Sequence, residues 1–376
     1  MNENNPCDVR FTQYRKEYGG ILLKILHRWR GVNRMKLRIH LAPIVCIWAM
    51  ASILTCAFGH TNYHVIKMIT LGGNGMWDYL NLDSSHRLLF ISRSTHMIVM
   101  NVDTDKVVGD IPDTPGVHGI ALAEDIGKGF ISDGGDNTVA VIDLRTLKTI
   151  GKIQVGDRPD SILYDPFTHR VFTFNGGSSN STVIDARTDK VVGTAPLDAR
   201  PEAAVSNDKG LIFVNIPDKA EIQVFDAKSL ATLHAWSVSP GDGGSGLAID
   251  EKHDVLFSTC RNHLMVVMDG TTGRILATPE IGAGPDAAIF DPMTQEAFSS
   301  NGMDGTLSVI KRTANGSYQT METIPTEKGA RTMALDAKTH AIYLVTAKFV
   351  PDNGTPTPPW RRKVVPDTFT VLEVGR

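Results

Sequence analysis

The sequence predicts an all-β fold, a seven-bladed β-propeller in which each blade has four antiparallel strands. Three observations lead to this prediction: a repeat of about 42 residues, short alternating strands inside each repeat, and an N-terminal segment that matches the missing part of the last repeat. Repeats of 40–45 residues with four strands are typical of blades that pack around a central channel.

The repeat is clearest at the residue that ends a Val-Ile-Asp type of strand. Successive copies are 42, 42, 41, 43 and 42 residues apart. A strand with an aromatic residue precedes each copy, as in LLFIS and VFTF, and no segment shows a helical period. The aligned residues are Asn101, Asp143, Asp185, Asp226, Asp269 and Lys311.

The seventh repeat is divided between the two ends of the chain. AIYLVT (341–346) and TFTVLEVG (368–375) supply two of its strands, separated by a proline-rich segment that cannot join a strand ladder. YHVIKMITLG (63–72) matches outer strands such as LKTIGKIQVG (147–156). We therefore expect residues 63–376 to form one propeller whose ring is closed by the N-terminal strand.

Residues 1–59 read as a basic leader followed by a signal peptide or anchor. Nine Lys/Arg face three Asp/Glu in residues 1–40, and residues 41–58 carry no charge. Met35 is a candidate true start, and cleavage, an uncleaved anchor and a lipoprotein at Cys56 are the alternatives. We expect an exported, periplasmic protein or one anchored to the inner membrane facing the periplasm. Outside the leader the only cysteine is Cys260, so no intrachain disulfide is expected there.

Charge restricts the partners of residues 41–376. Together they carry 29 Lys/Arg and 38 Asp/Glu, which argues against bulk nucleic-acid binding. Contact with a membrane is expected only through an uncleaved N-terminal segment. We expect a monomer whose partner is a small ligand or a periplasmic protein.

The repeats resemble the YVTN-type repeat of bacterial YncE-like β-propellers. VFTFN, LIFVN and AFSSN, followed by T-V-I-D or L-S-V-I, carry the resemblance, which covers residues 63–376. It implies the propeller fold and an exported protein without an established catalytic activity. The consensus Asn stands at Asn175, Asn215 and Asn301. It is replaced at Arg93, Asp133, Cys260 and Thr346.

Two recurrent polar positions are interpreted as structural. The Asp residues that end the Val-Ile-Asp strands are expected to accept backbone N–H bonds in the following turn. The three consensus Asn residues are expected to adopt left-handed geometry at the inner hairpin. Cys260 is expected to be a small buried filler.

One position per blade is expected to point to the channel mouth. The residues, 40 to 45 apart, are Asp78, His118, Asp160, Glu202, Ser245, Asp286 and Arg331. Clustered carboxylates repel unless a cation compensates them, so Asp78, Asp160, Glu202 and Asp286 are candidate ligands for a divalent ion such as Ca²⁺. Trp77 either stacks on a ligand or packs between blades. The competing interpretation is a polar lining of a water-filled channel.

Two functions compete on this pattern. The first is a non-catalytic binding or scaffold propeller that presents the channel mouth to a small ligand or protein. The alternative is a metal-dependent hydrolase or lactonase that uses the carboxylate ring, with His118 as a possible general base. A basic-aromatic patch at Trp360, Arg361 and Arg362 is a candidate surface contact, with a solvated loop as the alternative.

Overall fold

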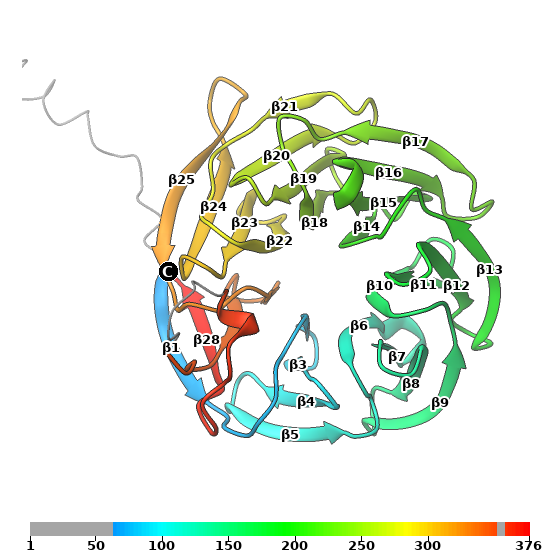
Figure 1. Ribbon diagram of the computed structural model, residues 1–376, viewed down its shortest axis with the longest axis vertical. Coiled ribbons are helices and arrows are strands. Elements are labelled where there is room, and N and C mark those ends of the chain that lie inside the picture. The colour runs from blue at the N-terminus through cyan, green and yellow to red at the C-terminus, as the bar shows by residue number, and fades with distance from the viewer. Residues whose placement is uncertain (1–62, 352–357) are drawn as a thin grey trace, which may run out of the picture. The chain divides into compact units, whose positions relative to one another are not determined.

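The structure is a computed structural model that describes residues 63–351 and 358–376, and these residues form seven four-stranded antiparallel sheets in a ring (Figure 1). The predicted seven-bladed propeller is thereby confirmed. The predicted leader, residues 1–59, and residues 352–357 of the proline-rich loop lie outside the described residues. Within the described ranges, no helix has the length and apolar character needed to cross a membrane.

The first three blades use four consecutive strands each, from the channel outward. Blade 1 contains β2 (Leu80–Asp83), β3 (Leu88–Arg93), β4 (His96–Asn101) and β5 (Lys106–Ile111). Blade 2 contains β6 (Val117–Ala123), β7 (Lys128–Asp133), β8 (Thr138–Asp143) and β9 (Lys148–Gln154), with η1 (Glu124–Ile126) between β6 and β7. Blade 3 contains β10 (Pro159–Asp165), β11 (Arg170–Asn175), β12 (Asn180–Asp185) and β13 (Lys190–Pro196).

The next three blades repeat this order. Blade 4 contains β14 (Ala204–Ser206), β15 (Leu211–Ile216), β16 (Glu221–Asp226) and β17 (Thr232–Ser237), with η2 (Pro217–Lys219) between β15 and β16. Blade 5 contains β18 (Gly244–Asp250), β19 (Val255–Cys260), β20 (Leu264–Asp269) and β21 (Ile275–Ala277). Blade 6 contains β22 (Pro285–Asp291), β23 (Glu296–Asn301), β24 (Thr306–Arg312) and β25 (Tyr318–Pro325).

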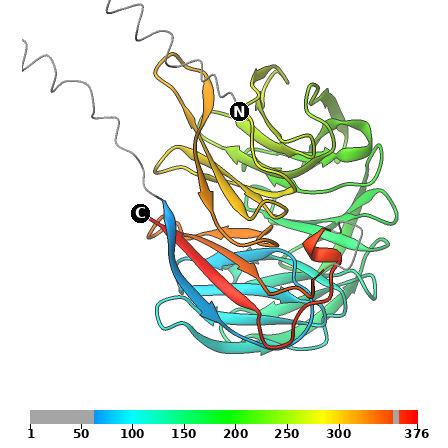
Figure 2. The same ribbon diagram turned by 60° about the vertical axis from the view of Figure 1, so that its left-hand side comes forward.

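The seventh blade joins the two ends of the described chain. Its strands, from the channel outward, are β26 (Met333–Leu335), β27 (Ile342–Thr346), β28 (Thr370–Gly375) and β1 (His64–Thr70). β1 lies antiparallel beside β28 in both views, with Thr70 opposite Thr370 (Figures 1 and 2). Closure by the N-terminal strand is therefore confirmed.

Each space between neighbouring blades holds its own apolar cluster, so the seven blades are joined by seven clusters. The second strand of every blade carries an aromatic side chain that is at most 2% exposed at an equivalent position, and in six blades this ring lies opposite a valine on the third strand. The seven aromatic residues are Phe90, Phe130, Phe172, Phe213, Phe257, Phe298 and Tyr343. Burial of both faces of each sheet stabilises the ring at about 25 cal/mol per Å² of apolar surface.

The recurrent Asp residues cap turns, as predicted. Asp143 accepts a hydrogen bond from the backbone N–H of Thr146 at 2.7 Å, and Asp185 accepts one from Thr188 at 2.8 Å. The explanation offered for the consensus Asn residues is wrong, because Asn175 is not among the residues with positive φ. Its side chain is fully buried in β11 and its amide donates to Thr182 Oγ1 at 3.0 Å, so a buried hydrogen bond selects it.

Two of the residues that replace the consensus Asn, Cys260 and Arg93, are buried in different ways. Cys260 is a fully buried free thiol, as expected for a filler. Arg93 is 1% exposed and donates through its two terminal nitrogens to the carbonyls of Gly72 and Asn74, at 3.3 and 2.7 Å. Its guanidinium lies 3.7 Å from the centre of the Phe369 ring, so it links the first and last blades.

We predict that removal of residues 63–72 from a chain that begins at Thr61 opens the ring. β28 would lose its ladder partner, and the clusters that receive Tyr63, Ile69 and Leu71 would be exposed. The expected result is a thermal transition that is lower by more than 10 °C or no longer cooperative, measured by circular dichroism. A cooperative transition at the temperature of the Thr61 control would contradict closure by β1.

Candidate functional site

The residues predicted for the channel mouth lie at or just before the starts of the inner strands. In four of these strands the pairing with the second strand shifts and skips two residues at this place: 118–119 in β6, 160–161 in β10, 245–246 in β18 and 286–287 in β22. Such irregularities bend a strand and redirect its side chains. We call the seven residues predicted for the channel mouth the ring residues. At four of them the inner strand is not paired with the second strand of its blade.

Hydrogen bonds between neighbouring blades fix these strand starts. The N–H of Tyr79 donates to the carbonyl of His118 at 3.0 Å, and the hydroxyl of Ser132 donates to the carbonyl of Asp160 at 2.6 Å. The hydroxyl of Thr332 donates to the carbonyl of Asp78 at 2.7 Å. The ring residues are thus held by backbone contacts, which leave the side chains of Asp78, His118 and Asp160 for other interactions.

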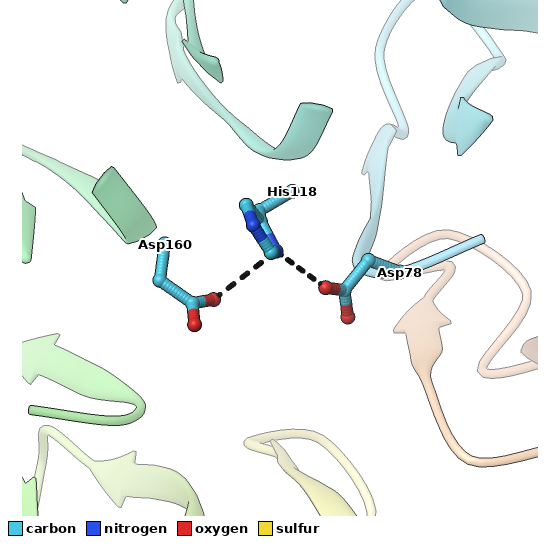
Figure 3. A group of neighbouring side chains, drawn as sticks. All are labelled: Asp78, His118 and Asp160. Carbon is cyan, nitrogen blue, oxygen red and sulfur yellow. Dashed lines mark hydrogen bonds and ion pairs between the residues drawn. The ribbon is translucent and has the colours of Figure 1, made fainter. Parts of the chain in front are cut away.

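His118 lies between two carboxylates of the ring (Figure 3). Its Nδ1 is 2.6 Å from Asp78 Oδ2 and 3.5 Å from Asp160 Oδ1. Burial alone would lower the pKa of the imidazole, but the hydrogen bond to Asp78 and the charge of Asp160 outweigh it and raise the pKa to about 9. His118 is therefore a cation at neutral pH.

Arg331 is the second internal cation of the ring. Its guanidinium forms an ion pair with Asp78 at 3.3 Å and a shorter contact with Asp286, and it donates to the carbonyl of Trp77 at 2.8 Å. Burial raises the pKa of Asp78, but Arg331 and His118 more than reverse this and hold the pKa below its ordinary value. For Asp286 burial prevails, and its pKa is raised.

Asp160 and Glu202 are less well compensated. Arg200 lies 3.3 Å from Glu202 and 4.0 Å from Asp160, and Arg261 lies 3.7 Å from Glu202. Both arginine side chains are about half exposed, at 51% and 55%. Burial is the main cause that raises the pKa of Asp160 to about 6 and that of Glu202 to about 7. These two carboxyls retain the strongest tendency to take up a proton or another cation.

Two predicted contact residues do not face the mouth. Trp77 is 3% exposed and packs against Phe369 and Phe349, with ring centres 5.4 and 5.9 Å apart. The packing interpretation holds for this indole, because Phe349 at the base of the proline-rich loop covers it. Ser245 is 6% exposed and its hydroxyl donates to the carbonyl of Pro285 at 2.9 Å, so it joins two blades and is not a ligand contact.

Sequence reasoning missed three residues of the site. Arg200 stands two positions before Glu202 in the recurring Arg-Pro-acid motif, which is a signal that could have identified it. Arg261 follows β19, in a hairpin whose position in the repeat gave no such indication. Tyr79 follows Asp78, and its phenol lies close enough to all four ring carboxylates that their charges, after burial, raise its pKa. Small residues or Thr occupy this position in the other blades.

The described residues contain one group whose geometry suits a metal ion. Asp78, His118 and Asp160 each offer one ligand atom, and these atoms lie within 4.8 Å of one another. The predicted set of four carboxylates is altered by Arg331, which already pairs with Asp78 and Asp286. Among the four carboxylates, Asp160 and Glu202 are the two that Arg331 does not pair with, and Ca²⁺ would need further oxygen ligands there, since it prefers six to eight.

The basic-aromatic patch is partly described. Trp360 belongs to η3 (Pro359–Arg361), Arg361 is exposed and Arg362 is half-buried. The loop joins the fold through an isolated bridge between Phe349 and Val364. A contact role for Arg361 and Arg362 stays a prediction.

Comparisons with known proteins support the fold. No protein-family model matches the chain, and no curated protein matches its sequence. A solved structure of hydrazine synthase from Kuenenia stuttgartiensis is similar, with a TM-score of 0.65 and 14% identity over 72% of this chain and 92% of that one. A chain of a mitotic checkpoint complex has a TM-score of 0.67 and 15% identity over 84% and 95%. A solved structure of the RRP9 WD40 repeats has a TM-score of 0.67 and 9% identity over 83% of this chain and 97% of that one.

We predict that the imidazole of His118 titrates with a midpoint near pH 9. Its folded pKa lies above the ordinary value of about 6.5, so its contribution to stability is complete below pH 6.5 and is lost as pH rises toward 9. The raised pKa values of Asp160 and Glu202 act in the same direction between about pH 4 and 7. The melting temperature should therefore fall from pH 5 to pH 9.

This titration is measured by NMR of the histidine ring. In Asp78→Asn the midpoint should fall by roughly one pH unit or more, because the hydrogen-bonded carboxylate is removed. A midpoint near pH 6.5 in the unmodified protein would show that the neighbouring carboxylates do not keep His118 protonated at neutral pH.

We predict that Arg331→Met destabilises the protein by about 3 kcal/mol, because it leaves Asp78 and Asp286 without their shared cation. Urea denaturation at pH 7 measures the change. Adding Asp286→Asn to Arg331→Met should restore part of the loss, since it removes one of the uncompensated carboxylates. Equal stability of the single and double variants would mean that Arg331 acts through packing alone.

Proposed function

We propose that this protein is an exported, non-catalytic propeller that binds a small, positively charged ligand at the acidic channel mouth. One observation carries the proposal: burial and the charge of Asp160 raise the pKa of Glu202, and burial raises the pKa of Asp160, although Arg200 lies 3.3 Å from Glu202 and His118 lies 3.5 Å from Asp160. A ligand cation between these two carboxylates would favour their ionised forms. Ca²⁺ and a protonated amine share this chemistry.

The state of His118 supports binding rather than catalysis. A general base must be free of its proton at the working pH, whereas the pKa of His118 is about 9. Its Nδ1 is also engaged by Asp78 at 2.6 Å. The imidazole therefore acts as a fixed positive charge that orients the carboxylates.

Export and family are part of the same proposal. The basic leader before the uncharged segment 41–58 supports export to the periplasm, with an inner-membrane anchor as the alternative. The repeats VFTFN, LIFVN and AFSSN support kinship with YncE-like propellers. The proposal extends to a protein partner at the same mouth, because one solved structure with this fold is a chain of a mitotic checkpoint complex.

A metal-dependent hydrolase or lactonase is the second candidate, and one observation favours it. The ligand atoms of Asp78, His118 and Asp160 lie within 4.8 Å of one another. A metal there would displace the proton of His118 and activate a water molecule. This candidate requires metal-dependent lactone hydrolysis that His118→Gln abolishes.

The proposal is tested by calorimetric titration with calcium chloride and, separately, with 1,5-diaminopentane at pH 7.5. We expect one of these probes to bind and the double variant Asp160→Asn/Glu202→Gln to weaken binding roughly tenfold to hundredfold, because each lost contact involves a charge. Asp143→Asn is the matched control, since this aspartate caps an exposed turn. The absence of binding by both probes, or equal affinity in the double variant, would reject the proposal.

A further inference from the structure

The central channel contains a chamber that begins just beyond the ring residues. It has a volume of about 370 Å³ and is lined by residues of all seven inner strands or their starts. Its larger side chains are mainly aliphatic, and small residues widen it. Of the aliphatic residues, Leu80, Ile120 and Leu247 are buried in the clusters between blades, whereas Ile162, Ile289 and Leu335 are half-buried and leave part of their side chains to the chamber. This volume lies within the range of small-molecule sites.

Tyr79 separates this chamber from the acidic mouth. It lines the chamber, while its phenol is close to the four ring carboxylates. A Cβ at Gly119 would lie 3.4 Å from the Cβ of Tyr79, so the tyrosine packs over this glycine and extends toward the axis. Tyr79 thus narrows the chamber on the side of the ring carboxylates, and the opposite face lies at the ends of the inner strands.

On that opposite face lies a second hollow, which we call the far groove. It has a volume of about 560 Å³, and Leu122, Leu163, Val205 and Ile249 form its apolar walls. Ala204 lines both the chamber and the far groove, so the two spaces adjoin there.

The rim of the far groove is acidic. Glu124, Asp208 and Glu251 are exposed there, and the pKa of each is raised, first by burial and then by neighbouring carboxylates. Lys209 Nζ donates to the backbone carbonyl of Glu251 and lies 3.0 Å from Asp254. Part of the positive charge of Lys209 is therefore paired with Asp254 and not with the rim carboxylates. A cationic group is therefore favoured beside the apolar entrance.

We propose that the chamber binds the apolar chain of a small amphipathic amine whose ammonium group stays at the rim of the far groove. The chamber residues span about three strand positions, or roughly 10 Å along the channel, which suits a short alkyl chain. Apolar burial supplies the affinity, and the rim carboxylates select the charge of the head group. This site is separate from the acidic mouth and does not depend on the function proposed for it.

The test is a calorimetric titration of the protein with octylammonium chloride. We expect binding that weakens roughly fourfold for each methylene removed from the chain. Sodium octyl sulfate should bind at least tenfold more weakly, because it meets the carboxylates of the rim. Ala204→Leu, which fills the junction of the two spaces, should reduce binding at least tenfold, and Asp208→Asn/Glu251→Gln should reduce the preference for the amine.

Two controls keep the outcomes distinct. Glu327→Gln removes an exposed carboxylate outside the far groove and should change nothing, and Asp160→Asn/Glu202→Gln should leave octylammonium binding intact. In the unmodified protein, NMR contacts should join the alkyl chain to the methyl groups of Ile162, Ile289 and Leu335, whether or not Ala204→Leu folds. Absent contacts, or binding lost only in the Asp160/Glu202 variant, would overturn the proposal.

Discussion

The structure depends on one constraint: each four-stranded sheet has two apolar faces, and neither can be covered within its own blade. Seven clusters satisfy this constraint, one in each space between neighbours. A single unclosed space would expose two faces at once. This explains why the first described strand, β1, pairs with the last, β28, and why Tyr63 also reaches blade 6, where its hydroxyl donates to Glu296 at 3.0 Å.

Closure also creates the candidate site. Once the blades stand around one axis, any residue that repeats at the start of the inner strand is brought near its six equivalents. Charged residues at this position would repel one another if they had one sign, and here His118 and Arg331 are interspersed with four carboxylates. The charges of these residues therefore alternate in part, and the alternation is weakest at Asp160 and Glu202, whose pKa values are raised.

The fold could be predicted because a period of about 42 residues constrains every blade at once. A strand that is wrongly assigned in one repeat is corrected by the aligned strands of the other six. The convergence of His118 with Asp78 and Asp160 followed from the same register. Single side chains had no such redundancy. The covering of Trp77 depends on Phe349 from a loop that interrupts the repeat, and Ser245 turns away because a neighbouring carbonyl is within reach.

Tyr79 shows how a departure from the repeat shapes the channel. The equivalent residues in the other blades are Gly, Ser, Ala or Thr, so one tyrosine occupies space that the other six leave open. Tyr79 is therefore the one large side chain at this position of the repeat. A single large residue in one blade is therefore what allows a symmetric channel to hold a charged compartment and an apolar one side by side. Tyr79 stands where the two compartments meet, because it lines the chamber and its phenol is close to the four carboxylates.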